Sequence, residues 1–172
     1  EGHPIDRFTG LYRDGGATIA PGRPPVVLPI GRAVGGTTVA NSGTCYRPPA
    51  EVQRRWRDLH GLEMADPVAL APYLEAVEAT LRIGPVPSSV MGRNGELLLT
   101  GAARKGWSSH PITRNAPDCV GSCQCAIGCQ RNAKFGVHLN ALPQACDAGA
   151  RIISHARVTE VRHVGGRATG VV

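Results

Sequence analysis

The stretch GRAVGGTTVANSGTCYRP, residues 31–48, concentrates glycine and hydroxyl side chains and decides how the rest of the chain is interpreted. Its four glycines let the backbone approach a ligand without an intervening Cβ atom. The turn Gly35-Gly36-Thr37 can present consecutive backbone N–H groups to an anion. This composition is typical of a loop that holds a phosphate-bearing cofactor, and it is also compatible with an ordinary surface loop rich in glycine and threonine.

The order of residues in this stretch resembles the flavin loop of the glucose-methanol-choline (GMC) oxidoreductases. That loop reads Gly-x-x-x-Gly-Gly-Ser/Thr-Ser/Thr-x-x-Asn-Gly-Gly and is followed by an Arg-Pro pair, here Arg47-Pro48. In the family, the Gly-Gly-Thr turn lies along the diphosphate and ribityl chain of FAD, and the asparagine lies at the isoalloxazine edge. Ser42 replaces a common glycine, and the Asn-Ser-Gly-Thr-Cys form resembles the branch acting on long-chain alcohols. The resemblance implies these FAD-binding candidates: Gly31, Arg32, Gly35, Gly36, Thr37, Asn41, Gly43 and Thr44.

A second segment, AKFGVHLNALPQACDAGARIISHARVTEV, resembles the second FAD-contacting region of the same family. There a Leu-Pro-x-Ala helix and a Gly-Ala-x-Ile strand precede a valine whose backbone hydrogen-bonds the adenine, which implies that role for Val158. Glu1 matches the acidic residue that ends a strand and hydrogen-bonds the cofactor ribose, although any chain can happen to begin with Glu. Two matches in the right order extend the resemblance over almost the whole chain.

The predicted fold class is α/β. No Gly-x-Gly pair occurs, so the fingerprint that opens a Rossmann half is absent from the sequence. We therefore predict a partial FAD-binding, Rossmann-like domain that lacks its first βαβ unit, carries inserted helices and ends in a β-hairpin. Residues 1–172 form one incomplete FAD-binding domain in this interpretation. Its parts are the flavin loop at 31–48, a helical insertion at 50–117, and the cysteine cluster, a helix and adenine-side strands at 118–172.

Local signals place the secondary structure. Asp66 and Pro67 indicate a helix N-terminus, and helical patterns cover residues 50–60, 66–81, 94–105 and 141–148. Trp56 and Leu59 should face inward. Residues 1–30 hold so many prolines and glycines that we expect little regular structure there. Strands are predicted over residues 151–154 and 157–164, with a tight Gly-Gly reversal into a third over 168–172.

Four cysteines fall within eleven residues, at positions 119, 123, 125 and 129. Soft metals prefer thiolates, but spacers of three, one and three residues fit a zinc site poorly. Flavin-dependent glucose and fructose dehydrogenases of bacteria resemble this family and carry a three-iron cluster in the equivalent region, which implies Cys119, Cys125 and Cys129 as metal ligands of an iron–sulfur cluster. The alternatives are a Cys-x-x-Gly-Cys pattern that binds no metal, as in long-chain alcohol-oxidising relatives, and a disulfide.

The function implied by the resemblance is the FAD-binding part of an enzyme that oxidises a small-molecule alcohol by hydride transfer to the flavin N5. Oxygen or another electron acceptor then reoxidises the flavin. The base of the family is a histidine near the C-terminus of the full-length protein. No histidine here has a comparable context, so we assign no catalytic residue and expect the fragment alone to be inactive. For Arg47 we expect a structural salt bridge.

Two other function classes are compatible with parts of the sequence. The cysteines also suit an iron–sulfur or metal electron-transfer module. A net charge of +6 suits a nucleic-acid-binding domain, but the basic residues are scattered and form no stripe interleaved with aromatics, so no nucleic-acid partner is expected. No apolar run reaches about 18 residues, so we expect no transmembrane segment and a cytoplasmic location, with peripheral membrane attachment of the full-length protein as an alternative.

Overall fold

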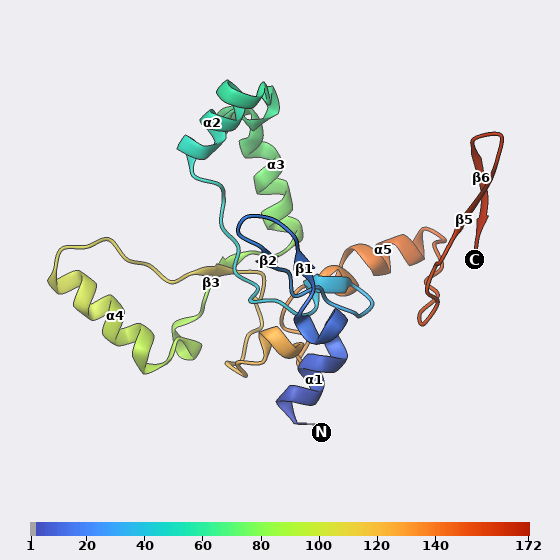
Figure 1. The fold of residues 1–172 in the computed structure, drawn as a ribbon. Coiled ribbons are helices and arrows are strands. Elements are labelled where there is room, and N and C mark those ends of the chain that lie inside the picture. The colour runs from blue at the N-terminus through green and yellow to red at the C-terminus, as the bar shows by residue number, and fades with distance from the viewer. Residues whose placement is uncertain (1–2) are drawn as a thin grey trace.

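Residues 3–172, the part of the chain that this computed structural model describes, contain five α-helices, three two-stranded sheets and several short 3-10 helices joined by long loops (Figure 1). The helices are α1 (Pro4–Leu11), α2 (Ala50–His60), α3 (Pro67–Thr80), α4 (Gly92–Arg104) and α5 (Ala141–Asp147). The strand pairs are β1 (Ile19–Ala20) with β2 (Val26–Val27), β3 (Gly84–Pro85) with β4 (Thr113–Arg114), and β5 (Val161–Val164) with β6 (Arg167–Val171). This mixed content agrees with the predicted α/β class. Each of these sheets is antiparallel, so the described residues alone form no parallel Rossmann sheet.

Helix α1 contradicts the expectation of little regular structure before residue 30. His3 Nδ1 accepts a hydrogen bond from the Ile5 backbone N–H at 3.3 Å, and Pro4 occupies the first helical turn. Proline is compatible with that turn because its missing N–H would have had no partner inside the helix. The rings of Phe8 and Tyr12 stack at the end of the helix with centroids 4.4 Å apart. The number of prolines before residue 30 therefore does not exclude a helix, because a proline in the first helical turn is compatible with one.

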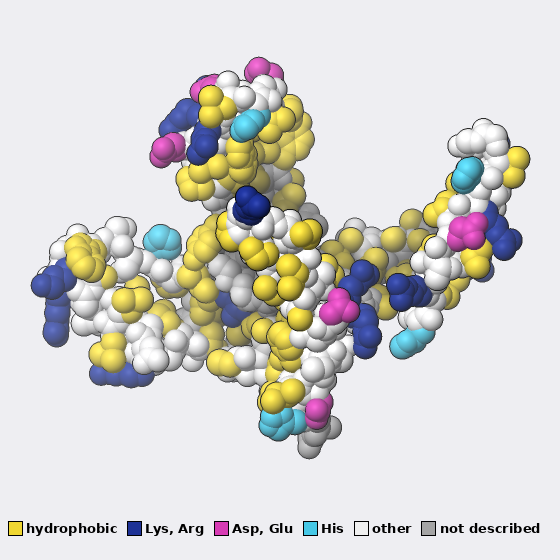
Figure 2. Space-filling view, viewed as in Figure 1, with side chains coloured by type: hydrophobic (Ala, Val, Ile, Leu, Met, Phe, Trp, Pro, Cys, Tyr) yellow, Lys and Arg dark blue, Asp and Glu magenta, His cyan; other side chains and the backbone are white. Residues whose placement is uncertain are grey.

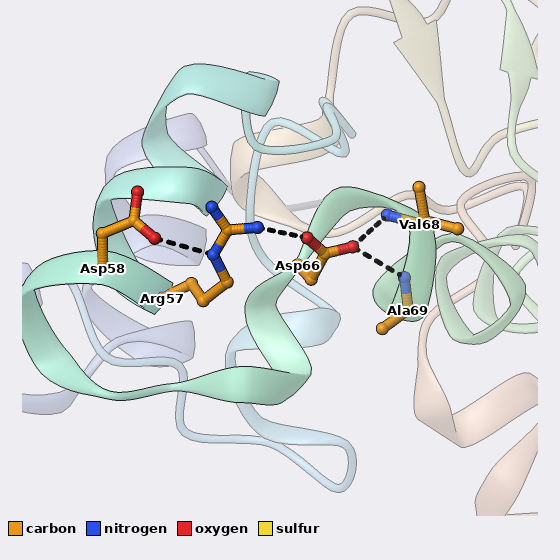
Figure 3. Close-up of polar contacts among 5 residues, drawn as sticks. All are labelled: Arg57, Asp58, Asp66, Val68 and Ala69. Carbon is orange, nitrogen blue, oxygen red and sulfur yellow. Dashed lines mark hydrogen bonds and ion pairs between the residues drawn. The ribbon is translucent and has the colours of Figure 1, made fainter.

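Helices α2 and α3 project together from the rest of the chain (Figure 1). Arg57 of α2 donates from Nε to Asp58 at 2.7 Å and from Nη1 to Asp66 at 2.5 Å, as Figure 3 shows. The other oxygen of Asp66 accepts from the backbone N–H groups of Val68 at 2.9 Å and Ala69 at 3.3 Å, which confirms the predicted N-cap. These backbone donors, together with Arg57, lower the pKa of Asp66 from its ordinary value of 3.8.

Asp66→Ala should lower the midpoint of thermal unfolding of the full-length protein by a few degrees, because it removes both cap bonds and a partner of Arg57. The folded-state pKa of Asp66 is depressed, so its contribution to stability is present above the unfolded-state pKa and is lost as the pH falls through the folded-state value. Calorimetry at neutral and acidic pH measures both effects. Asp58→Ala, which leaves the cap intact, is the control, and equal midpoints for the two variants would contradict the assignment.

The C-terminal hairpin confirms only part of the predicted strands. Val161 pairs with Val171 and Val164 with Arg167, across the predicted Gly-Gly reversal. The predicted strand over 151–154 is not formed, and the strand predicted to begin at residue 157 begins at residue 161. A strand is stabilised by hydrogen bonds to a neighbouring strand. Within the described chain, residues 151–158 pair with no other strand. Their high content of Ile and Val is therefore not enough to make them a β-strand.

The buried core is small and unusually polar. Its apolar members are Tyr12, Ala40, Ala65, Ala102, Ala116 and Ala133, and its polar members are Gln53, Asn115, Lys134 and Asn140. The chain exposes 12707 Å², whereas a compact monomer of this mass would expose about 8,000 Å². Apolar side chains are spread over the visible surface in Figure 2, and the predicted inward-facing residues Trp56 and Leu59 are 37% and 68% exposed. Specific polar contacts therefore contribute much of what holds the central segments together.

Candidate cofactor site

Residues 31–38 fold into a tight turn whose shape depends on glycine. Gly35 and Gly36 have φ angles of 97° and 55°, and a short 3-10 helix covers Gly36–Thr38. The Gly31 N–H donates to Thr37 Oγ1 at 3.0 Å. A Cβ on Gly31 would lie 2.8 Å from backbone atoms of Gly36 and Thr37, so no side chain fits there. A Cβ on Gly36 would meet no atom within 4 Å, so the turn is packed on one side and open on the other.

The second half of the loop is closed by Asn41 and Gly43. Asn41 Nδ2 donates to the Thr37 carbonyl at 2.8 Å, and Asn41 Oδ1 accepts from the Gly43 N–H at 2.7 Å. Gly43 is buried with a φ of 69°, and a Cβ there would lie 3.1 Å from Asn115 Oδ1 and 3.2 Å from Lys134 Cδ. Asn41 and Gly43 therefore pack against the residues behind the loop.

The remaining candidates differ in their surroundings. The exposed Arg32 donates from its backbone to the Leu11 carbonyl at 2.6 Å, and its guanidinium lies 3.4 Å from the Gly10 carbonyl oxygen. Thr44 is exposed and forms an isolated bridge with Arg114 of β4. The structure thus brings the eight candidates of residues 31–48 together in one continuous loop, with Gly31 and Gly43 buried.

Arg47 ends the loop in the predicted structural salt bridge. Its Nε and Nη2 donate to the two carboxylate oxygens of Glu78 in α3, at 2.7 and 2.6 Å. This fork-shaped geometry is characteristic of strong arginine–carboxylate pairs. The hydrogen bond from Arg47 lowers the pKa of Glu78. The pair therefore anchors the end of the loop to the helical segment.

Lys134, which the sequence analysis did not single out, lies directly behind the loop. It is 1% exposed, and its Nζ donates to the Asn41 carbonyl at 2.9 Å, to Asn41 Oδ1 at 3.3 Å and to the Cys125 carbonyl at 3.0 Å. Burial lowers the pKa of Lys134; Cys125 and Cys129 act in the opposite direction, and Arg114 lowers it further. One buried amine thus connects the loop to the cysteine-rich segment.

Tyr12 and Arg114 make two further connections that were not predicted. The Tyr12 hydroxyl lies 3.0 Å from the Ala40 carbonyl oxygen and 2.5 Å from that of Ala126. Arg114 Nη2 donates to the Ser42 carbonyl at 2.6 Å. Each side chain joins segments distant in sequence, so no local pattern indicated it.

A cavity of about 240 Å³ adjoins the loop. Its lining includes Val39 from the loop, Cys129 and Lys134 from the segment behind it, and His138. His138 packs against Gly35, where an added Cβ would lie 3.3 Å from the histidine Cβ. Its Nδ1 is buried without a hydrogen-bond partner in the described chain. Burial, and then the charge of Lys134, lowers the pKa of His138 below its ordinary value of 6.5. A mainly neutral imidazole therefore lines the cavity at pH 7.

The cysteines do not form the predicted metal site. Within residues 3–172, no group of three or more His, Cys, Asp or Glu side chains is arranged to hold a metal ion. Arg114 Nη2 donates to Cys125 Sγ at 2.7 Å, so this sulfur has a cationic side chain as its neighbour. Cys119 lines a separate small cavity with Arg82 and Pro85. Cys119, Cys125 and Cys129 are therefore not gathered around one point in the described residues, and all six cysteines are free thiols, so no disulfide is formed among them.

Cys129 differs from the other thiols in its electrostatic surroundings. The partial burial of Cys129 raises its pKa. The backbone N–H groups of Lys134, Arg131 and Ala133, with the charge of Lys134, lower the pKa by more than burial raises it, so the net shift is downward from 9.0. Backbone donors around a sulfur favour its thiolate form.

Val158, the predicted adenine contact, is not assembled with the loop. Val158 is 54% exposed and lies between α5 and the β5–β6 hairpin, which extends away from the centre of the molecule (Figure 1). Glu1 lies outside the described residues. The candidate site that the structure assembles is consequently the loop 31–48 and the side chains behind it.

Comparison with known proteins decides the family, because the GMC oxidoreductase family profile matches residues 8–172. The chain belongs to the GMC oxidoreductase family. An uncharacterized GMC-type oxidoreductase of Mycobacterium tuberculosis is 67% identical over 169 residues, which cover 98% of this GMC chain and 27% of the relative. A GMC-type oxidoreductase of Sinorhizobium fredii is 34% identical over 97% of the chain and 33% of its own length. A long-chain-alcohol oxidase of Arabidopsis thaliana is 30% identical over 89% of the chain and 20% of its own length.

This GMC chain therefore spans about a quarter to a third of the bacterial relatives and corresponds to a part of longer proteins. No solved structure matches it with significance. Among the described helices, none has the length and apolar character needed to cross a membrane. Membership of the family favours the oxidoreductase interpretation over the metal-module and nucleic-acid alternatives.

Proposed function

We propose that this chain contributes the flavin side of the FAD site in a GMC oxidoreductase that oxidises an alcohol. The observation that carries the proposal is the asymmetry of the Gly31–Thr37 turn. At Gly31 the turn is packed against its own backbone, whereas a Cβ on Gly36 would enter open space. The exposed residue Thr37 and the glycine backbone beside open space suit the close approach of a diphosphate. These residues therefore fit the cofactor that the family implies.

The proposed roles follow the loop. Gly35, Gly36 and Thr37 would hold the diphosphate and ribityl chain, and Asn41 would lie at the flavin edge. Because Gly31 and Gly43 are buried against neighbouring atoms, we assign them to shaping the loop. The exposed Arg32 and Thr44 lie at its borders. Val158 and Glu1 remain the proposed adenosine-end contacts, and the domain division at residues 31–48, 50–117 and 118–172 is part of the same proposal.

The proposed chemistry is that of the whole protein. FAD, held by Gly35, Gly36, Thr37 and Asn41, would supply a hydride acceptor for the alcohol carbon. This chain binds and orients the cofactor, and the buried side of its loop excludes water from that face. The similarity to a long-chain-alcohol oxidase of Arabidopsis thaliana, together with the Asn-Ser-Gly-Thr-Cys form of the loop, favours a long-chain alcohol as the substrate.

The decisive experiment is an anaerobic absorption spectrum of the full-length protein. We expect flavin bands that bleach when a long-chain primary alcohol is added and FAD in the supernatant after denaturation. Glucose and a short-chain alcohol at the same concentration are the controls. A protein that carries no flavin after reconstitution with FAD contradicts the proposed cofactor, whereas flavin that no alcohol reduces contradicts the proposed substrate class.

A further inference from the structure

Lys134 is the largest fully buried side chain of the described residues, and its burial requires a reason. Removing an ammonium group from water is costly unless hydrogen bonds compensate for the lost solvation. All three acceptors of Lys134 are amide oxygens, and none of the ion pairs in the described chain involves it. Neutral oxygens alone compensate poorly for the desolvation of a cation, so this lysine is not explained by fold stability.

The acceptors show what this amine arranges. Lys134 Nζ binds the carbonyl and the side-chain oxygen of Asn41, which is 93 residues away in sequence. Asn41 Oδ1 also accepts from the Gly43 N–H, and Asn41 Nδ2 donates to the Thr37 carbonyl. The lysine therefore fixes both the backbone and the side-chain orientation of Asn41, and Asn41 in turn connects the two halves of the loop.

The third acceptor fixes the amine itself. Cys125, whose carbonyl binds Nζ, lies in the segment that Arg114 and Tyr12 also tie to the loop. Lys134 is thus held by the Cys125 carbonyl as well as by Asn41. Because Lys134 binds both the loop and the Cys125 segment, the loop has little freedom to change shape without breaking a buried hydrogen bond.

We propose that Lys134 is a positioning residue for the cofactor, which holds Asn41 and the Gly35–Gly43 loop in their binding shape before FAD binds. This inference rests on the proposed function, because it assigns the loop to FAD. Its expected consequence is pre-organisation: a loop that is already ordered loses less conformational entropy when the ligand binds. Lys134 acts through Asn41 and needs no contact with the cofactor.

The test compares Lys134→Met with Lys105→Met in the full-length protein. Methionine keeps an unbranched side chain of similar length but cannot donate hydrogen bonds, and Lys105 is an exposed lysine beyond the end of α4. We expect Lys134→Met to weaken FAD binding to the apoprotein by about tenfold or more. The visible circular dichroism of bound flavin should change, and amide hydrogen exchange in residues 35–43 should become faster. Lys105→Met should leave all three measurements unchanged.

Several results separate the outcomes. A starting protein that binds no FAD contradicts the proposed function. Normal FAD affinity and an unchanged dichroism spectrum in Lys134→Met overturn the role of Lys134 while the proposed function stands. If Lys134→Met does not fold, acetylation of the unaltered apoprotein with an amine reagent, mapped by mass spectrometry, decides: Lys134 should be protected and Lys105 reactive. Equal reactivity of the two lysines would overturn the inference.

Discussion

Gly31→Ala is expected to abolish detectable FAD binding by the full-length protein. The new Cβ would lie 2.8 Å from the Gly36 carbonyl group and from Thr37 Cα. These are backbone atoms of the turn itself, so they cannot move aside as a flexible side chain would. The turn must open, and the hydrogen bond from the Gly31 N–H to Thr37 Oγ1 is lost with it. Fluorescence titration of the apoprotein with FAD measures the loss.

Gly10→Ala is the matched control for this prediction. Gly10 lies inside helix α1, and a Cβ there would meet no atom within 4 Å. Alanine is preferred over glycine in a helix, so the control should bind FAD normally and be as stable as the starting protein or slightly more stable. Normal FAD binding by Gly31→Ala would show that the turn is not the cofactor cradle.

Gly36→Ala should weaken FAD binding by roughly 10- to 100-fold while leaving most of the apoprotein fold intact. The new Cβ has no neighbour within 4 Å among the described residues. The substitution therefore adds only the strain of a non-glycine residue with a positive φ angle. The methyl group projects into the space that we assign to the cofactor. FAD titration and thermal unfolding of the apoprotein, measured together, separate the two effects.

Gly61→Ala isolates the backbone strain. Gly61 ends α2 with a φ of 63°, close to the 55° of Gly36, and its Cβ would also meet no atom within 4 Å. The two variants should therefore lose similar stability, and only Gly36→Ala should lose FAD affinity. Equal FAD affinities for the two variants would place the cofactor elsewhere.

Local features of the sequence predicted local features of the structure. The helix that begins at Asp66 was predicted because a carboxylate followed by proline satisfies the first turn with atoms close in sequence. The β5–β6 hairpin was predicted from its Gly-Gly turn for the same reason. Helix α1 was not predicted although its cap is equally local, because histidine is not among the residues that are preferred at helix N-caps.

The parts of the site that were missed depend on contacts across the chain. Lys134 meets Asn41, and Tyr12 meets Ala126, across 93 and 114 residues. Neither pair has a spacing or composition that distinguishes it, because these contacts exist only after the segments pack. The contact between Arg114 and the Cys125 sulfur, 11 residues apart, is likewise not indicated by the spacing of the cysteines.

The distance in sequence between Asn41 and Lys134 also determines the order in which the two residues are synthesised. A ribosome adds about 5–20 residues per second, so roughly 5–20 s pass between the synthesis of Asn41 and that of Lys134, 93 residues later. During that interval the glycine-rich loop has left or is leaving the exit tunnel without the amine that orders it. The cofactor cradle is accordingly completed only after residue 134 has been synthesised, and a nascent chain truncated before residue 134 presents the loop without its support.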